Sequence, residues 1–598
     1  MKEIKEKISE KKERLRSRIR QRSLAALGNY EGTFLMILAV VIGFLSGLGS
    51  VGFKMLIRLV KTGFWAHWGG YSGYVPGDIT TLLVPLAPFI GGLLVGPISV
   101  LFPAEAEGDG VPEVLEAVVL KGGVLKLRTV FIRAFASAIC LGSGGSAGRE
   151  GPIAQIGSAI GSSFGQLFRM SANNVRTLLG CGAAGGIAAT FNAPIAGVLF
   201  ALEIVLGEWN IATFSPVIMA SVIATATERY IEGNIPAFNV PIYELVNPVE
   251  IIFYIILGLL AGLTALLFIQ SLNFFKETFE NRVKVPNWTK PAIGGLLLGL
   301  ICLFFPQLFG NGYNPMGQAL MGNMALGLMV VLLFLKILAT SLTLGSGSSG
   351  GLFAPSLYIG AMLGGSFGTL VHYLFPTLTA TKGAYALVGM GATFAAAAHA
   401  PMTNILILFE ITGNYQIILP IMASCIVSTL VIKHFSPHSI YTIRLHQRGI
   451  TIEAGKEVNV LQSLKVRDAM STEMEIIAED MPFDKILMHM TRSTYSNFPI
   501  VNRNKELTGI LSFQDLRKHV FEPDLEKVVV AKDIATLHVT TVIPSDSLKD
   551  ALAKLSYRNV EQLPVVDAMN PKKLLGILTR RDIITTYNKA IFRYETSS

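Results

Sequence analysis

The sequence predicts an all-α, multi-pass membrane protein, built from an inverted internal repeat with broken and re-entrant helices and followed by a soluble α/β tail. Hydrophobic residues make up 51% of the chain and charged residues 15%, and the mean hydropathy is +0.52, unlike an average soluble protein. A glycine-rich stretch at residues 142–165 recurs without a gap at 345–368, an offset of 203 residues. Two apolar halves that each contain a glycine- and proline-interrupted segment indicate a binding site at the repeat interface.

The domain organisation follows from changes in composition along the chain. Residues 1–30 are rich in Lys and Arg with interspersed Glu, so they predict a cytoplasmic basic helix rather than a cleaved signal peptide. We expect the two membrane repeats at 31–240 and 241–445, and a linker at 446–465. Several apolar runs are shorter than the ~20 residues of a perpendicular span, or contain Gly and Pro, so tilted and broken helices are expected.

The net charge of the chain indicates which partners to expect. The net charge of +9 suits cytoplasmic segments beside an anionic membrane leaflet. No basic stripe accompanies a nucleic-acid-binding fold, so we expect the lipid bilayer of the cell membrane, and no nucleic acid, as a partner.

Three glycine-rich turns end in a proline, at 108–112 (GDGVP), 148–152 (GREGP) and 351–355 (GLFAP). Proline is favoured in the first turn of a helix, and glycine lets backbone amides approach a ligand, so each turn predicts a helix that begins within the membrane. Such an N-terminus offers N–H groups and about +0.5 charge to an anion. The alternative is that the glycines only permit close helix packing, which explains the spacing in 157–165 but not the turns.

One of these turns contains Glu150, a carboxylate in an apolar segment. Such a residue is costly in a membrane and marks an ion pathway by default. In the other repeat its position is taken by Phe353, so the fold does not require the acid. The alternative is a structural pair with the neighbouring Arg149.

The three turns in this order resemble the CLC family of chloride channels and proton-coupled chloride antiporters, from about residue 30 to Tyr441. The resemblance implies a homodimer with one pore in each subunit, a transporter and not an enzyme. It also implies that Glu150 is a gating residue whose carboxylate competes with chloride. The residues that it places around the anion are Asp109, Gly110, Arg149, Gly351, Leu352, Phe353 and Tyr441.

Asp109 departs from the family pattern, in which serine is common at this position of chloride-preferring members. An ionised carboxylate would repel chloride by several kcal/mol at low dielectric. Asp109 is therefore protonated, turned away as a helix cap, or a sign of altered anion selectivity. We favour the cap, because the matching residue in the second repeat is Asn311, which is also a good N-cap.

Ile204 is the second departure. Familiar antiporters carry two consecutive glutamates here, whereas this chain has Glu203 followed by Ile204, so the inner proton-relay position holds an aliphatic side chain. An aliphatic side chain cannot carry a proton, which favours a channel, but the family also contains antiporters without this acid. Channel and antiporter both remain open.

The tail contains two similar units, in which a strand is followed by Ser512 and Asp515 or by Thr579 and Asp582. They resemble a tandem pair of CBS domains at 466–525 and 526–592. The resemblance implies that these four residues hold an adenine nucleotide (ATP, ADP or AMP), whereas helix capping alone is the alternative. Nucleotide reaches only a cytoplasmic tail, so we expect both chain ends on the cytoplasmic side.

Two other classes of membrane protein fit the sequence less well. An intramembrane metalloprotease needs His-Glu-x-x-His, but no histidine in this chain is followed by glutamate. A CBS-regulated divalent-cation transporter needs several acidic oxygens that converge. The isolated Glu150, Glu203 and Glu410 suit an anion better, so no metal and no required cofactor are expected.

Overall fold

The computed structural model describes residues 2–65, 84–447 and 464–587, apart from short gaps at 235–237, 239, 242, 244, 494, 496, 518–528, 538 and 559. The chain forms two compact units, Met1–Gly455 and Lys456–Ser598, and each is described by itself. Most of the predicted linker at 446–465 lies outside the described residues.

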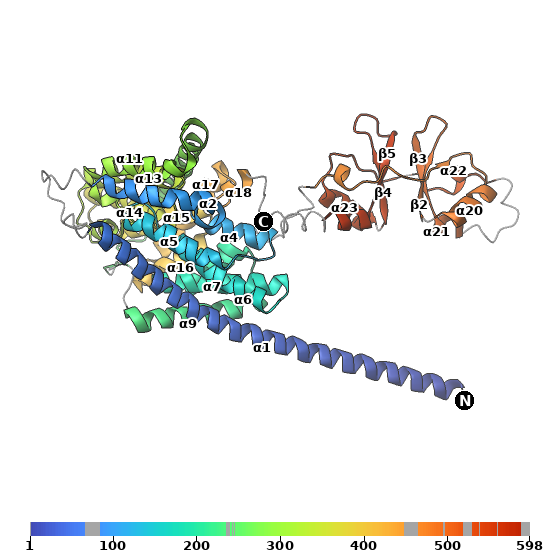
Figure 1. The fold of residues 1–598 in the computed structure, drawn as a ribbon, viewed down its shortest axis with the longest axis horizontal. Coiled ribbons are helices and arrows are strands. Elements are labelled where there is room, and N and C mark those ends of the chain that lie inside the picture. The colour runs from blue at the N-terminus through green and yellow to red at the C-terminus, as the bar shows by residue number, and fades with distance from the viewer. Residues whose placement is uncertain are drawn as a thin grey trace. The chain divides into compact units, whose positions relative to one another are not determined.

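The first unit is helical, and its second half repeats the order of its first half (Figure 1). The elements of the first repeat are α1 (Lys2–Trp65), α2 (Leu86–Leu101), α3 (Pro103–Ala106), α4 (Val111–Leu120), α5 (Arg128–Gly142), α6 (Glu150–Leu167), α7 (Ala172–Phe191), α8 (Pro194–Leu199), η2 (Phe200–Leu206) and α9 (Ile211–Glu232). Those of the second are α10 (Glu250–Glu277), η3 (Thr278–Arg282), η4 (Asn287–Thr289), α11 (Lys290–Cys302), η5 (Pro306–Leu308), α12 (Tyr313–Leu320), α13 (Leu326–Gly345), α14 (Phe353–Leu374), α15 (Lys382–Ala398), α16 (Pro401–Thr412), α17 (Ile418–Phe435) and α18 (Ile443–Gln447).

The helix lengths confirm the predicted mixture of long and broken helices. In the described part of the chain, six helices are long and apolar enough to cross a membrane, and α2 and α16 are apolar but shorter. The first of these helices, α1, lies along α9 (Figure 1) and continues past residue 30 without a break.

Matched breaks separate equivalent helices of the two repeats. Asn192 ends α7 and His399 ends α15, both in the left-handed conformation, with φ of 58° and 57°. Pro194 and Pro401 then occupy the first position of α8 and α16. A left-handed residue satisfies the end of one helix and proline suits the start of the next, which explains the Asn-Ala-Pro and His-Ala-Pro sequences.

Close packing explains the glycines that follow each turn. A Cβ atom at Gly161 would collide with the Leu178 carbonyl of α7, and one at Gly364 would collide with the Tyr385 carbonyl of α15. The small-residue interpretation therefore holds for these glycines, which let α6 and α7, and likewise α14 and α15, approach backbone to backbone.

The second unit confirms the predicted α/β tail. Its elements are η6 (Val466–Asp468), β1 (Ile477–Ala478), α20 (Phe483–Arg492), β2 (Asn497–Val501), β3 (Leu507–Ser512), α21 (Phe513–Arg517), α22 (Ala531–Ile534), α23 (Leu548–Arg558), β4 (Gln562–Val566) and β5 (Leu574–Thr579). Strand β2 lies between β1 (parallel) and β3 (antiparallel), and β4 pairs with β5 (antiparallel). Phe498 opposes Leu511 in one half, and Leu563 opposes Leu578 in the other. Each half has its own apolar core.

Candidate functional site

The three glycine turns meet at the interface between the repeats. Gly148 and Gly351 form an antiparallel bridge, in which the N–H of each donates to the carbonyl of the other, at 2.7 and 2.6 Å. The Gly108 N–H donates to the Ser348 carbonyl at 3.0 Å, and the Gly350 N–H donates to the Gly108 carbonyl at 3.0 Å. The first turns of α6 and α14 therefore begin side by side, two residues beyond the bridge.

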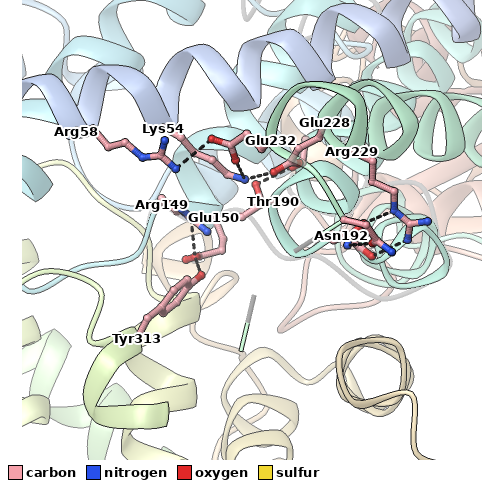
Figure 2. Close-up of polar contacts among 12 residues, drawn as sticks. Lys54, Arg58, Arg149, Glu150, Thr190, Asn192, Glu228, Arg229, Glu232 and Tyr313 are labelled. Atoms are coloured by element: carbon pink, nitrogen blue, oxygen red, sulfur yellow. Dashed lines mark hydrogen bonds and ion pairs between the residues drawn. The ribbon is translucent and has the colours of Figure 1, made fainter. Parts of the chain in front are cut away.

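Glu150 is the first residue of α6, and its side chain is fully buried. Its Oε1 accepts a hydrogen bond from the Tyr313 hydroxyl at 2.5 Å (Figure 2). Arg149 Nε lies 3.9 Å from the same oxygen, and the Arg149 guanidinium lies 5.1 Å from the centre of the Tyr313 ring. Glu150 Oε2 has no hydrogen-bond partner among the described residues. The alternative pair with Arg149 is therefore present but long, and the main partner is Tyr313, which the sequence analysis missed.

A cluster of charged residues lies beside Arg149 (Figure 2). The Lys54 ammonium of α1 contacts Glu228 of α9 and donates to Glu232 Oε2 at 3.0 Å. Arg58 also reaches Glu232, at 3.1 Å. Sequence reasoning did not single out this cluster, although charged residues within two apolar helices were a usable signal.

Asp109 precedes Gly110, the N-cap residue of α4, so it is not itself the N-cap that we favoured, and it is not turned away from the proposed anion position. Its Oδ2 accepts from the Val111 N–H at 3.3 Å, at the start of α4. Its Oδ1 accepts from the Leu352 N–H at 2.5 Å, immediately before α14. Gly110 lies between these contacts, with φ of +92°, a backbone conformation that favours glycine. The carboxylate thus binds one of the amides that were predicted to hold the anion.

Two arginines hold the loop that carries Asp109. Arg133 is fully buried, and its Nη1 donates to the carbonyls of Gly108 at 2.8 Å and Ala106 at 3.2 Å. Arg444 of α18 forms ion pairs with Glu107 at 2.8 Å and Glu113 at 3.3 Å. Contacts from two helices, α5 and α18, therefore hold this loop in place.

The remaining predicted anion ligands lie in the same region. The Gly351 N–H is used in the bridge to Gly148. Phe353 begins α14, so its N–H has no acceptor within the helix, and its ring packs 4.8 Å from that of Phe191 and 3.9 Å from that of Phe394. Tyr441 is buried and lies within electrostatic reach of both the Asp109 and the Glu150 carboxylates.

A cavity of about 80 Å³ reaches this region. Asp109 and Leu352 lie on its wall together with apolar residues of α10, and Lys276 and Arg444 add positive charge. The cavity lies beside α18, the last helix of the first unit that the structure describes.

Glu203 and Glu410 cap helices of the opposite repeat. The Glu203 carboxylate accepts from the N–H groups of Met402 at 3.2 Å and Thr403 at 2.7 Å, at the start of α16. The Glu410 carboxylate accepts from Ile195 at 3.0 Å and Ala196 at 2.7 Å, at the start of α8.

Ile204, the residue at the inner proton-relay position, lies in the π-helical segment η2 and belongs to the apolar core. It therefore brings no titratable group to this region of the structure.

The four tail residues form two matching helix caps. Ser512 Oγ donates to Asp515 Oδ2 at 2.7 Å, and the Asp515 N–H donates back to Ser512 Oγ at 3.3 Å. Thr579 and Asp582 repeat this arrangement, at 2.6 and 3.1 Å. Each pair satisfies the start of a helix without a ligand.

Comparisons with known proteins agree with this architecture. A family model described as voltage gated chloride channel matches residues 91–433, and a CBS domain model matches residues 466–522 and 531–589. The putative chloride channel protein ClcB-like of Ralstonia nicotianae is 33% identical over 416 residues, which are 68% of this chain and 95% of the relative. The H(+)/Cl(-) exchange transporter ClcA of Vibrio parahaemolyticus is 33% identical over 422 residues, 69% of this chain and 89% of the relative.

A crystal structure of a slow cyanobacterial Cl-/H+ antiporter is similar with a TM-score of 0.63 and 28% sequence identity, and the match covers 69% of this chain and 97% of that one. Repeated helices that meet at their N-termini define an inverted-repeat membrane transport protein. The chain belongs to the voltage gated chloride channel family, the CLC family that its motifs resemble, and its tail contains two CBS domains.

The family assignment does not favour the divalent-cation transporter that the sequence left as an alternative. Within the described ranges, no three His, Cys, Asp or Glu side chains gather as they would around a metal ion.

Proposed function

We propose that this protein transports chloride across the membrane in exchange for protons, with Glu150 as the gate. The supporting observation is the buried carboxylate at the first residue of α6, which has one oxygen on Tyr313 and the other without a partner among the described residues. A negative charge at a helix N-terminus occupies the position that a small anion would take. Protonation removes this charge, so proton uptake by Glu150 and entry of an anion become linked.

The names of similar proteins support exchange, since the Vibrio relative is an H(+)/Cl(-) exchange transporter and the similar crystal structure is that of an antiporter. Ile204 supports a second candidate, a chloride channel, because a buried aliphatic side chain cannot pass a proton inward. In a channel, Glu150 would gate the flow of anions without coupled movement of protons.

Reversal potentials separate the two candidates. The full-length chain is reconstituted in liposomes, and the reversal potential is measured under opposed chloride and pH gradients. An exchanger shifts its reversal potential with the pH gradient, whereas a channel follows the chloride gradient alone. A complete lack of chloride flux would reject both.

We also propose that the CBS domains bind an adenine nucleotide and thereby modulate transport. The matched Ser512/Asp515 and Thr579/Asp582 pairs support this, since they stand at the same turn of the two halves. Titration calorimetry of the full chain with ATP, ADP and AMP tests it. No heat of binding at millimolar nucleotide would leave the four residues as helix caps.

The assembly and orientation are part of the same proposal. We propose a homodimer with both chain ends in the cytoplasm of the cell. Subunit counting by single-molecule photobleaching tests the dimer, and accessibility of terminal tags in sealed vesicles tests the orientation.

A further inference from the structure

We infer that Asp109 is a second, inner carboxylate that competes with the transported anion for the Leu352 amide, so that protonation of Asp109 and binding of an anion there favour each other. This inference rests on the proposed chloride transport and deepens it. Glu150 lies at the start of α6, whereas Asp109 accepts from the Leu352 N–H, immediately before α14.

The competition follows from the hydrogen bonds of Asp109. Its Oδ1 lies 2.5 Å from the Leu352 nitrogen, so the single hydrogen of that amide is already donated to a carboxylate. An anion that is to bind the Leu352 N–H must displace this oxygen. Only 4% of the Asp109 surface is exposed, so two negative charges would lie together with little water to screen them. Loss of the Asp109 charge removes this repulsion.

The second repeat indicates that the fold does not need this negative charge. Asn311 stands at the equivalent position, and its Oδ1 accepts from the Tyr313 N–H at 3.5 Å, before α12. A neutral side chain therefore suffices before the equivalent helix. The carboxylate of Asp109 is specific to the first repeat, and its Oδ1 reaches the Leu352 N–H of the other repeat.

The cavity beside α18 reaches Asp109. This cavity of about 80 Å³ has Asp109 and Leu352 on its wall, so a group that enters it meets the carboxylate and the amide together. Ile204 offers no titratable group, whereas Asp109 places one on the wall of this cavity beside the Leu352 amide.

Several charged or titratable groups surround Asp109. The charged or titratable side chains that surround it or line the same cavity are Arg133 (α5), Glu113 (α4), Arg444 (α18), Lys276 (α10), Glu107 and Tyr441. Arg444 pairs with both glutamates, Lys276 lies 3.6 Å from Glu280, and Arg133 is bound to the loop carbonyls. Arg133 thus offsets the charge of Asp109, and when Asp109 is neutral an anion can take the place of that negative charge.

The inference can be tested by binding measurements alone, because proton binding and chloride binding are thermodynamically linked. If protonation of Asp109 strengthens chloride binding, then chloride binding must raise proton affinity by the same factor. Glu150 would contribute its own proton linkage, so the measurement belongs in a Glu150→Gln background, and the comparison with Asp109→Asn in that background isolates the response of Asp109.

The test is titration calorimetry of chloride into the full-length Glu150→Gln chain in detergent, near pH 5 and near pH 8. We expect chloride to bind about tenfold more tightly at the lower pH. In the Glu150→Gln, Asp109→Asn double variant, this pH dependence should disappear and chloride should bind tightly at both pH values. Asp109→Ser should behave in the same way, and since the equivalent Asn311 is neutral, both variants should fold. Asn311→Ser is the matched control and should leave the pH dependence unchanged.

The outcomes separate this inference from the proposed function. Chloride binding that persists at both pH values with no pH dependence in Glu150→Gln would overturn the role of Asp109 alone. That role is equally overturned if the pH dependence survives in the Glu150→Gln, Asp109→Asn double variant. Chloride binding that is absent from the unsubstituted chain and every variant would overturn the proposed transport of chloride.

Discussion

The two membrane repeats share their scaffold contacts but differ in the residues that would handle ions. Arg133 of α5 donates to the Gly108 carbonyl at 2.8 Å, and Lys336, at the matching position of α13, donates to the Gly310 carbonyl at 3.0 Å. Both cations are fully buried, and both hold the loop before a short helix. Contacts that occur twice therefore maintain the fold.

The unmatched residues lie at the helix N-termini. Glu150 begins α6, whereas the hydrophobic Phe353 begins α14. Asp109 reaches the Leu352 amide of the other repeat, whereas Asn311 contacts the Tyr313 N–H of its own repeat. Since the scaffold tolerates a neutral residue at both positions, the two carboxylates of the first repeat are the candidates for function. The predictions below test this division.

The largest effect is expected at Glu150. Glu150→Gln cannot release a proton, so it should abolish proton coupling in an exchanger, or pH-dependent gating in a channel, while chloride flux persists. Liposome flux and reversal potential as functions of pH measure this. Glu250→Gln is the control. Glu250 is equally buried, but its carboxylate accepts a hydrogen bond of 2.6 Å from the Ala380 N–H and takes no part in the site around Glu150. Unchanged pH dependence in Glu150→Gln would remove Glu150 from the gate.

The second-largest effect is expected from the removal of a buried cation that holds a loop. Arg133→Met should destabilise the protein by more than about 3 kcal/mol, because several carbonyls lose their donor. Lys336→Met should cost less, because Lys336 donates to the carbonyls of Leu308 and Gly310 only. Thermal unfolding in detergent measures both, and Arg133→Lys should recover part of the loss. Equal stability of Arg133→Met and the unsubstituted chain would contradict a scaffold role.

A smaller effect on stability is expected at Glu203 and at Glu410, each of which caps a helix of the opposite repeat, and the two effects should be nearly equal. Glu203→Ala and Glu410→Ala should each lower stability by about 1–2 kcal/mol, since each leaves two helix N–H groups without an acceptor. Glu203→Gln and Glu410→Gln retain an oxygen acceptor and should lose less. If Glu203→Gln removed proton coupling while Glu410→Gln did not, Glu203 would belong with the unmatched, functional residues.

The smallest effect extends the comparison to the two halves of the tail. Asp515→Ala and Asp582→Ala should each lower the stability of their own half by about 1 kcal/mol, because each removes a cap. Each should also weaken nucleotide binding in its own cleft. Calorimetry of the single variants with ATP, ADP and AMP measures this, and unaltered affinity in both would separate the caps from any nucleotide site.

The sequence predicted the architecture well because its signals are local or repeated. The glycine turns before Glu150 and Phe353 marked the starts of α6 and α14, and the offset between them revealed the duplication. The Ser512 and Thr579 caps were visible from the residues that follow each strand. The short-range contact of Asp109 with the Val111 amide was within reach of the sequence, since the two residues lie within one turn, although the N-cap of α4 is Gly110.

The membrane class, the repeat and the tail were thus determined by the sequence itself, through composition and short-range spacing. Only the tertiary structure decided that Asp109 also binds Leu352, 243 residues away, and that Tyr313 holds Glu150 across 163 residues. The Lys54 cluster likewise joins α1 to α9. Hydrogen bonds of this kind depend on how separate helices pack, and no periodicity within either segment specifies which partner lies opposite.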